Sequence, residues 1–301
     1  MTKKLNALHN GFKPQTVSFP SSDGTVVGHL YVPKDYSASH QYLAAVIGGS
    51  FSSVKEQMSG IYAGEMARRG IIGLAIDYRN YGESSGKIRQ FEDPESKATD
   101  ILAARTYLQH RQDISAVGLL GICTSGTTVL QAAAADPSVE AVATVAGSFF
   151  EPSLFNGVEK KHAAAKAART KYEQTGIVDM IPAYHPINPK AVNTVPMPYY
   201  LSKQRGNVTQ WRNEMAVMAW DAFLTTDAIT NAAKVIAPTL IVHSKMAAYP
   251  AQASKVYEQL AGPKQLIWDK GQHFSFYDHP KQVRQAANQV AEHFKKTLTN
   301  Q

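Results

Sequence analysis

The chain has 301 residues, 44% of them hydrophobic, and a formal charge of +7. This length allows one sizeable core, so we expect one domain with an elaboration. The charge does not indicate nucleic-acid binding, because basic residues are scattered and even their densest patch, residues 158–174, contains two glutamates. No apolar stretch approaches the roughly 18 residues of a membrane span, and the first residues lack a secretory signal pattern. We therefore expect a cytoplasmic protein that binds neither nucleic acid nor membranes.

The chain opens with a predicted β-hairpin, in which the turn sequence SSDG (21–24) separates extended runs at 16–20 and 25–32. From residue 42 onwards, short apolar runs alternate with helical patterns. The runs are typical of strands buried on both faces of a parallel sheet, and they lie at 42–49, 71–78, 116–122, 139–147, 238–244 and 264–271. The helical patterns lie at 55–69, 95–110, 125–136, 250–261 and 280–298.

This alternation predicts an α/β fold with a doubly wound, mostly parallel sheet, in which the strand C-termini share the edge where ligands bind. The alternation fails between residues 148 and 235, which contain a basic helix, a Pro-rich stretch and a second predicted helix at 213–229. We interpret 148–235 as a helical cap inserted into a core of residues 1–147 and 236–301. Large side chains of this cap could form an apolar pocket wall or the cap's own core: Tyr199, Tyr200, Trp211, Met218 and Trp220.

The third buried run ends in the sequence GICTSG (121–126), directly before a helical pattern. This matches a nucleophile elbow, a strained strand-to-helix turn in which the residues two before and two after the nucleophile must be small. Gly121 and Ser125 meet this requirement around Cys123. If Ser125 were the nucleophile, Cys123 and Thr127 would occupy the small positions, which is sterically worse. We predict Cys123 as the nucleophile; the alternative is that this single cysteine is a buried filler.

Two backbone segments at the same sheet edge are expected to stabilise an oxyanion. The N–H of Thr124 starts the helix after the elbow, and residues 48–51 follow the first parallel strand with exposed N–H groups. A thiol also needs a base, because its unperturbed pKa is about 8.5. His273 lies between the last predicted strand and the C-terminal helix, where the base of this architecture is expected.

The orienting acid of a catalytic triad is missing from its expected place. It should follow the run at 238–244, but the next residues are KMAAYP (245–250). Glu56 could instead approach the thiol directly, or it could be an ordinary carboxylate in the first turn of a helix. Other carboxylates that could substitute are Glu151, Asp221, Asp269 and Asp278.

The sequence contains no P-loop, and its ten histidines show no spacing typical of a metal site. We therefore expect neither a cofactor nor a metal ion. The expected partner is a small-molecule substrate, and a homo-oligomer is left open.

Taken together, these segments resemble the α/β-hydrolase superfamily, and within it the dienelactone-hydrolase-like branch that has cysteine at the elbow. The resemblance covers nearly the whole chain. In dienelactone hydrolases a glutamate near the oxyanion loop takes part in activating the thiol, and the similar segment here places that role at Glu56. The segments that carry the resemblance are GICTSG (121–126), QHFSFYD (272–278), DYRNYGESSG (77–86) and VKEQ (54–57).

The resemblance implies that Cys123 is the nucleophile and His273 the general base and acid. It also implies that Thr124, with Ser50 or Phe51, donates the oxyanion hydrogen bonds. We predict a hydrolase of a small ester or lactone that acts through an acyl-thioester intermediate. The alternatives are a catalytically impaired scaffold that binds a small molecule, and an acyltransferase that uses the same site.

Overall fold

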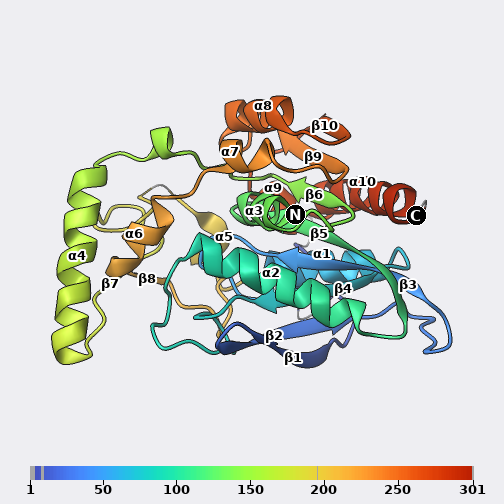
Figure 1. The fold of residues 1–301 in the computed structure, drawn as a ribbon, viewed down its shortest axis with the longest axis horizontal. Helices are drawn as coiled ribbons and strands as arrows, with labels where there is room; N and C mark the ends of the chain where they lie inside the picture. The colour runs from blue at the N-terminus through green and yellow to red at the C-terminus, as the bar shows by residue number, and fades with distance from the viewer. Residues whose placement is uncertain (1–3, 8–9, 195, 300–301) are drawn as a thin grey trace.

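A computed structural model describes residues 4–7, 10–194 and 196–299 of the chain. Its main element is an eight-stranded sheet with the order β1-β2-β4-β3-β5-β6-β9-β10 (Figure 1). β1 and β2 form an antiparallel hairpin, β2 also pairs antiparallel with β4, and the other neighbours are parallel. The strands are β1 (Gln15–Ser21), β2 (Gly24–Tyr31), β3 (Tyr42–Gly48), β4 (Ile72–Asp77), β5 (Ile114–Ile122), β6 (Val142–Val145), β9 (Thr239–Ser244) and β10 (Lys264–Asp269).

Helices cover both faces of this sheet. Alternate residues of a strand point to opposite faces, so Ala45 and Ile47 of β3 pack in the cluster with α1 and α10, whereas Ala44 and Val46 pack in the cluster with α2, α3 and α8. The helices are α1 (Met58–Ala67), α2 (Pro94–Gln109), α3 (Ser125–Ala135), α8 (Pro250–Gln259) and α10 (Pro280–Leu298). The prediction of an α/β fold with a doubly wound, mostly parallel sheet is confirmed.

The C-terminal helix α10 shows how the sequence pattern produces this packing. Its buried residues recur three or four positions apart, as on one face of a helix, and they lie against α1 and β5. They are Val283, Ala286, Ala287, Val290, Ala291, Phe294 and Leu298. Within the described ranges, no helix combines the length and the apolar character needed to cross a membrane.

The segment between β6 and β9 contains a helix, α4, that stands at the outer edge of the molecule in Figure 1. A small antiparallel sheet of β7 and β8 lies in the same segment, and the last helix, α7, packs against α3 and α8 of the core. The boundaries of the cap at 148 and 235 stay a prediction. The elements are η2 (Pro152–Leu154), α4 (Val158–Thr175), β7 (Met180–Pro182), α5 (Pro198–Leu201), β8 (Glu214–Ala216), η3 (Val217–Ala219), α6 (Trp220–Phe223) and α7 (Ala228–Ala232).

The single helix predicted at 213–229 is wrong. Residues Glu214–Ala216 pair with Met180–Pro182, because the small sheet buries Met215 and satisfies the backbone there. Only the short helix α6 (Trp220–Phe223) lies within this range before α7 begins at Ala228, where the Asp227 carboxylate accepts two N–H groups of the first turn. Pairing with a distant strand therefore replaces a helix that the local pattern favoured.

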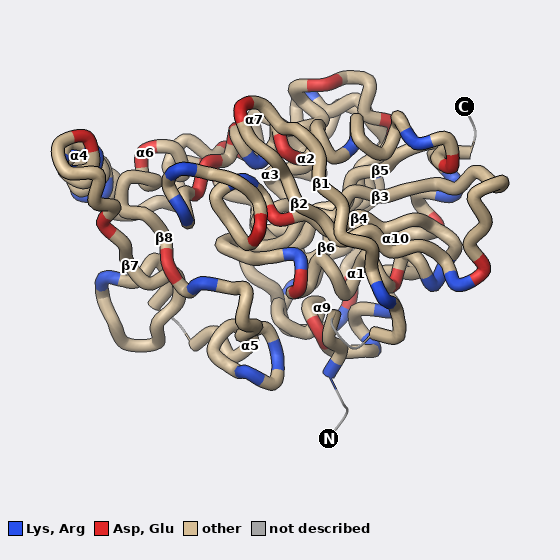
Figure 2. The backbone as a smooth tube through the Cα atoms, turned by 90° about the horizontal axis from the view of Figure 1, so that it is seen from below, with Lys and Arg blue, Asp and Glu red and all other residues tan. Residues whose placement is uncertain are grey.

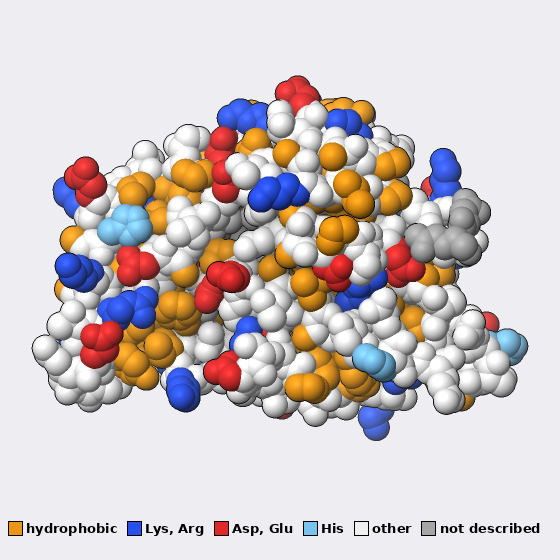
Figure 3. Space-filling view, in the orientation of Figure 1, with side chains coloured by type: hydrophobic (Ala, Val, Ile, Leu, Met, Phe, Trp, Pro, Cys, Tyr) orange, Lys and Arg blue, Asp and Glu red, His pale blue; other side chains and the backbone are white. Residues whose placement is uncertain are grey.

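Charged residues are spread over the fold. Figure 2 shows basic and acidic positions interspersed along the backbone, from the cap to the C-terminal helix. On the face shown in Figure 3, side chains of both signs likewise lie among hydrophobic and uncharged ones. Near the sheet edge, by contrast, the buried carboxylates of Glu56 and Asp77 gather around one lysine, Lys55.

Candidate active site

Cys123 lies on the sharp turn between β5 and α3. Its φ is +55°, in the left-handed region that a residue with a side chain rarely adopts. A Cβ added at Gly121 would collide with the carbonyl oxygen of Ser125, so the turn requires glycine there. The turn leaves Cys123 almost fully buried, with 8% of its surface exposed at the wall of a cavity. This is the backbone geometry of a nucleophile elbow.

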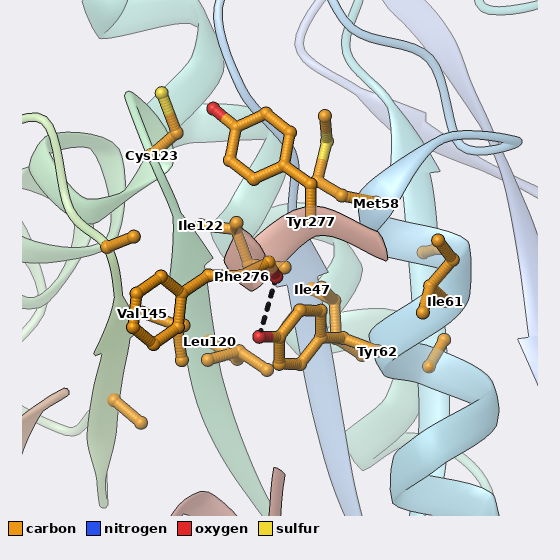
Figure 4. Packing of buried hydrophobic residues seen from close by; sticks show 14 of the residues in the cluster. Ile47, Met58, Ile61, Tyr62, Leu120, Ile122, Cys123, Val145, Phe276 and Tyr277 are labelled. Carbon is orange, nitrogen blue, oxygen red and sulfur yellow. Dashed lines mark hydrogen bonds between the residues drawn. The ribbon is translucent and has the colours of Figure 1, made fainter. Parts of the chain in front are cut away.

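Hydrogen-bond donors surround the thiol. Its Sγ lies 3.3 Å from the hydroxyl oxygen of Ser148 and 3.7 Å from that of Thr124, and the Tyr277 hydroxyl points toward it in Figure 4. Burial alone raises the pKa of Cys123. The charge and hydrogen bond of His273, with hydrogen bonds from Ser148 and Tyr277, outweigh burial and lower the pKa to about 6. The sulfur is therefore largely a thiolate at neutral pH.

A short helix, α9 (Ser275–Asp278), holds the groups that face the thiol. The Tyr62 hydroxyl of α1 donates a 2.9 Å hydrogen bond to the carbonyl oxygen of Phe276, which anchors α9 to the core (Figure 4). His273 directly precedes this helix, and its Nε2 lies 3.0 Å from the hydroxyl of Tyr277. Burial raises the pKa of Tyr277 well above its usual value, so this hydroxyl stays protonated.

The second ring nitrogen of His273 faces a donor. The backbone N–H of Ala248 donates to Nδ1 over 3.4 Å. Because a backbone N–H can only donate, the neutral ring in this arrangement carries its proton on Nε2. In this neutral form Nε2 donates to the oxygen of Tyr277, whose own proton is directed to the sulfur of Cys123. The charge of His273 that lowers the pKa of Cys123 belongs to the imidazolium form of the ring, which has no acceptor at Nδ1 for the N–H of Ala248.

Ala248 lies in the loop 245–250, where the triad acid was expected. In the described part of the chain, no carboxylate bonds to the imidazole of His273, and the loop supplies a backbone N–H instead. The four substitute carboxylates are bound elsewhere: Asp278 by Arg205, Asp269 by Lys270 and Gln285, Glu151 by Lys255 and Gln252, and Asp221 by His162.

Two of the expected oxyanion donors lie side by side. The N–H of Phe51 donates to the hydroxyl oxygen of Thr124 over 3.2 Å, and both residues line the cavity with Cys123. Ser50 is fully buried outside the lining, and its hydroxyl is hydrogen-bonded to that of Tyr200 in the cap. The donor role of these N–H groups stays a prediction.

Glu56 occupies a different place from the one expected. Its carboxylate Oε1 lies 2.9 Å from the ammonium group of Lys55 and 3.9 Å from Nε2 of His29. Glu56 is also not among the groups that shift the pKa of Cys123. This pairing does not fit a direct approach of Glu56 to the thiol, because the adjacent lysine holds the carboxylate in a buried charged cluster.

That charged cluster centres on Lys55, whose side chain is fully buried. Its ammonium group also lies 2.8 Å from a carboxylate oxygen of Asp77 and 2.5 Å from one of Glu83. Ligand atoms of His29, Glu56 and Glu83 lie within 4.8 Å of one another, which is compatible with a metal site. The lysine ammonium already contacts both glutamates, however, so a positive charge is present without an ion.

The cavity beside Cys123 has a volume of about 570 Å³ and is walled mainly by aromatic rings. Tyr200 and Trp220 of the cap belong to this wall, as one interpretation of the sequence expected. Tyr199, Trp211 and Met218 are buried but do not line it. The aromatic lining consists of Phe51, Phe150, Phe155, Tyr184, Tyr200, Trp220, Phe223, Tyr249, Phe274 and Tyr277.

Sequence reasoning missed Tyr277, Ser148 and Ala248. Tyr277 follows His273 by four residues, a spacing that places two side chains on one side of a helical turn. Ser148 follows β6, the neighbour of β5, so the rule that strand C-termini share an edge could have identified it. Ala248 offers only its backbone, and no side-chain signal could have indicated it.

Comparisons with known proteins show the family to which the chain belongs. The family model of the X-Pro dipeptidyl-peptidase (S15 family) matches residues 16–275. The chain is 27% identical to the uncharacterized protein YcjY of Escherichia coli, over 94% of this chain and 98% of that protein. It is 28% identical to the thiohydrolase aneE of Aspergillus aculeatus, over 85% of this chain and 86% of that protein.

A solved structure shows the same fold. The α/β-hydrolase GrgF from Penicillium sp. sh18 superposes with a TM-score of 0.81 at 19% identity, over 95% of this chain and 99% of that chain. The fold that the sequence pattern predicted is therefore shared with a solved α/β-hydrolase.

Proposed function

Because the chain belongs to the X-Pro dipeptidyl-peptidase (S15) family, within the α/β-hydrolase superfamily, we propose that it is a cysteine-dependent hydrolase. Its substrates are small carboxylic esters, including lactones and thioesters, and it acts through an acyl-thioester on Cys123. One observation carries this proposal. The thiol lies on a nucleophile elbow at the wall of a cavity, and His273, Ser148 and Tyr277 lower its pKa to about 6.

In the first step, the thiolate of Cys123 attacks the substrate carbonyl carbon. The C–S bond forms as the carbonyl electron pair moves to oxygen, and the N–H groups of Thr124 and Phe51 stabilise the negative charge. The N–H of Phe51 donates to the Thr124 hydroxyl, so that hydroxyl must turn away before the N–H can reach the substrate oxygen. The intermediate then expels the leaving group with its bonding electrons and becomes the acyl-thioester.

The hydrogen bond that Ala248 donates to His273 affects which leaving groups the site favours. In a Ser-His-Asp triad, the aspartate stabilises the imidazolium that protonates the leaving group. Here Nδ1 of His273 faces the N–H of Ala248, which opposes a proton at Nδ1. The imidazolium that protonates a leaving group therefore has no acceptor for its Nδ1 proton, and groups that leave with little protonation, namely thiolates, enolates and phenolates, should react faster than alkoxides.

The lack of a carboxylate bonded to the described His273 also argues against peptidase activity, after which the family is named. Hydrolysis of a peptide bond releases an amine, which must be protonated as it leaves. A ring without an orienting carboxylate is poorly suited to supply that proton. The thiohydrolase aneE, by its name, fits the leaving groups favoured here better than a dipeptidyl-peptidase does. We therefore extend ester and thioester hydrolysis to this chain, and not peptide cleavage.

Water completes the cycle by attacking the acyl-thioester. The new C–O bond forms, the C–S bond breaks and the thiolate of Cys123 returns, while the proton of the water passes to His273 or to solvent. Nε2 must be unprotonated to accept that proton, so the ring must adopt the tautomer that loses the bond to Ala248. Deacylation should therefore be slow compared with acylation, and the acyl-enzyme should accumulate.

The test is the reaction of the purified protein with para-nitrophenyl acetate and with a thioester of the same acid. We expect a burst of nitrophenol and an acetyl mass increase on Cys123. Cys123→Ala should lose turnover by a factor on the order of 10³ or more. Cys123→Ser should stay nearly inactive, because a serine needs stronger base assistance than this histidine receives.

Ser125→Ala is the matched control, since Ser125 is the other nucleophile that the elbow sequence allows, and this variant should keep turnover. The proposal fails if Cys123→Ala turns over these esters as well as the parent protein does, or if Cys123 carries no acyl group. Added alcohols or amines separate hydrolysis from acyl transfer: a transferase would form new esters or amides in place of free acid.

A further inference from the structure

One lysine side chain, and no carboxylate, lines the described part of the cavity beside Cys123. Lys161 is the single lysine or arginine among the lining residues that the structure describes, and those residues include no aspartate or glutamate. Lys161 lies in the first turns of α4 at the outer edge of the cap, whereas Cys123 enters from the turn after β5 (Figure 1). The cationic group and the nucleophile thus come from different parts of the molecule to one cavity.

The surroundings of Lys161 are apolar. Its ammonium group lies 4.5 Å from the ring centre of Trp220, and burial lowers the pKa of Lys161. Within the described ranges, no ion pair involves Lys161. By contrast, Lys171 on the same helix is paired with Asp179. An ammonium group that is partly removed from water without a counter-charge is costly, and an anion in the cavity would offset that cost.

Asp221, the acidic residue that follows Trp220 in the sequence, does not neutralise Lys161. Asp221 lies 2.9 Å from a ring nitrogen of His162 and 3.9 Å from Arg169, so its carboxylate is paired with other side chains. Uncharged polar residues also line the cavity, among them Asn156 and Thr194. Their side chains can donate hydrogen bonds to an anion without adding charge.

We propose that Lys161 binds a carboxylate or a similar anionic group of the substrate, away from the bond that is cleaved. The proposal rests on the proposed function. The preferred substrates are then esters or thioesters whose acyl part or leaving group carries a negative charge. The aromatic wall accommodates the apolar part between the anion and the reacting carbonyl, and Lys161 selects charged substrates over neutral ones of the same shape.

The test compares two substrates that differ only in charge, the para-nitrophenyl monoester of adipic acid and its methyl ester. Both release nitrophenol from the same acyl chain, so their chemical steps are alike. We expect a kcat/KM about 10- to 100-fold higher for the charged substrate, mainly through KM, because a hydrogen bond to an ionised group is worth that much. Lys161→Met should slow the charged substrate much more than the neutral one and so remove this preference, and Lys161→Arg should retain it.

Lys166→Met is the matched control, since Lys166 is exposed on the same helix and does not line the cavity; it should leave both rates unchanged. A second pair, neutral acyl esters of hydroxybenzoate and hydroxybenzamide, places the charge on the leaving group. A preference in either pair that Lys161→Met removes supports the proposal and identifies the charged part. It is overturned if neither pair shows a preference, or if Lys161→Met slows charged and neutral substrates equally.

The two proposals can fail separately. If neutral esters are not turned over through Cys123, the proposed hydrolase function fails. Calorimetric binding of adipate to Cys123→Ala still tests the anion site in that case. Binding that Lys161→Met weakens and Lys166→Met does not would keep the site, and binding that both variants leave unchanged would overturn it.

Discussion

Two groups of polar residues near the sheet edge differ in their charges. The candidate active site combines the thiol of Cys123 with His273 and hydroxyl groups, and no carboxylate of the described chain bonds to its histidine. The second group surrounds Lys55 with the carboxylates of Glu56, Asp77 and Glu83. In the described part of the chain, the site thus has no acid bonded to its histidine, whereas three acids gather around Lys55 in the loop that follows β3.

The charged group holds the backbone. Asp77, at the end of β4, accepts the backbone N–H of Lys55 over 2.7 Å and that of Glu83 over 2.9 Å. These bonds fix the loop that follows β3, which carries Phe51 and its expected oxyanion donor. Carboxylates thus position the loop, whereas hydrogen-bond donors stabilise the thiolate of Cys123.

Burial has opposite outcomes in the two places. Burial and the neighbouring Asp77 raise the pKa of Glu56, even though Lys55 counteracts them. Burial also raises the pKa of Cys123, but His273 and two hydroxyl groups lower it further than burial raises it. The ionisation of a buried group therefore depends on the donors and charges aimed at it.

The largest effect should come from removing the lysine of the charged group. Lys55→Met leaves the buried carboxylates of Glu56 and Asp77 without their counter-charge, and we expect the free energy of unfolding to fall by about 3–5 kcal/mol. Urea denaturation at neutral pH measures this. Lys166→Met, an exposed control, should change stability little. A loss no larger than that of the control would show that the charged group does not hold the fold.

The next effect should appear at the thiol. Because its pKa is lowered to about 6, alkylation of Cys123 by iodoacetamide should be fast above that pH and should be lost as the pH falls through it. His273→Gln removes the first of the groups that lower this pKa and should raise the midpoint by about two pH units, toward the value of about 8.5 for a free thiol. The chain has one cysteine, so mass spectrometry follows this reaction directly.

A midpoint near 8.5 in the parent protein would contradict the activated thiol and favour a binding scaffold. A midpoint that His273→Gln leaves unchanged would instead assign the low pKa to the hydroxyl groups.

The smallest effect should come from Tyr277→Phe. This change removes one hydroxyl donor from the thiolate and should raise the alkylation midpoint by about one pH unit, as the loss of a single hydrogen bond would. Tyr199→Phe is the matched control. Tyr199 is equally buried, and its ring lies 5.0 Å from that of Tyr277, but it does not line the cavity. Equal shifts in the two variants would mean that repacking, and not the hydroxyl, sets the thiol pKa.

Much of the fold could be predicted because its signals are local. Continuous apolar runs identified the parallel strands, and Asp93 before Pro94 marks the start of α2. The small residues around Cys123 predicted the elbow, whose positive φ and need for glycine the structure shows. The helix predicted at 213–229 failed, because β7 and β8 pair across more than thirty residues of chain.

The sequence by itself determined the strand and helix alternation, the elbow at Cys123 and the placement of His273 after the last strand, since each follows from neighbouring residues. Only the tertiary structure decided which groups meet. It placed Glu56 beside Lys55, directed the Tyr277 hydroxyl toward the thiol, and gave His273 the N–H of Ala248 where an acid was expected. These are contacts between distant segments, and a backbone N–H is carried by every residue except proline, so no residue type marks it in advance.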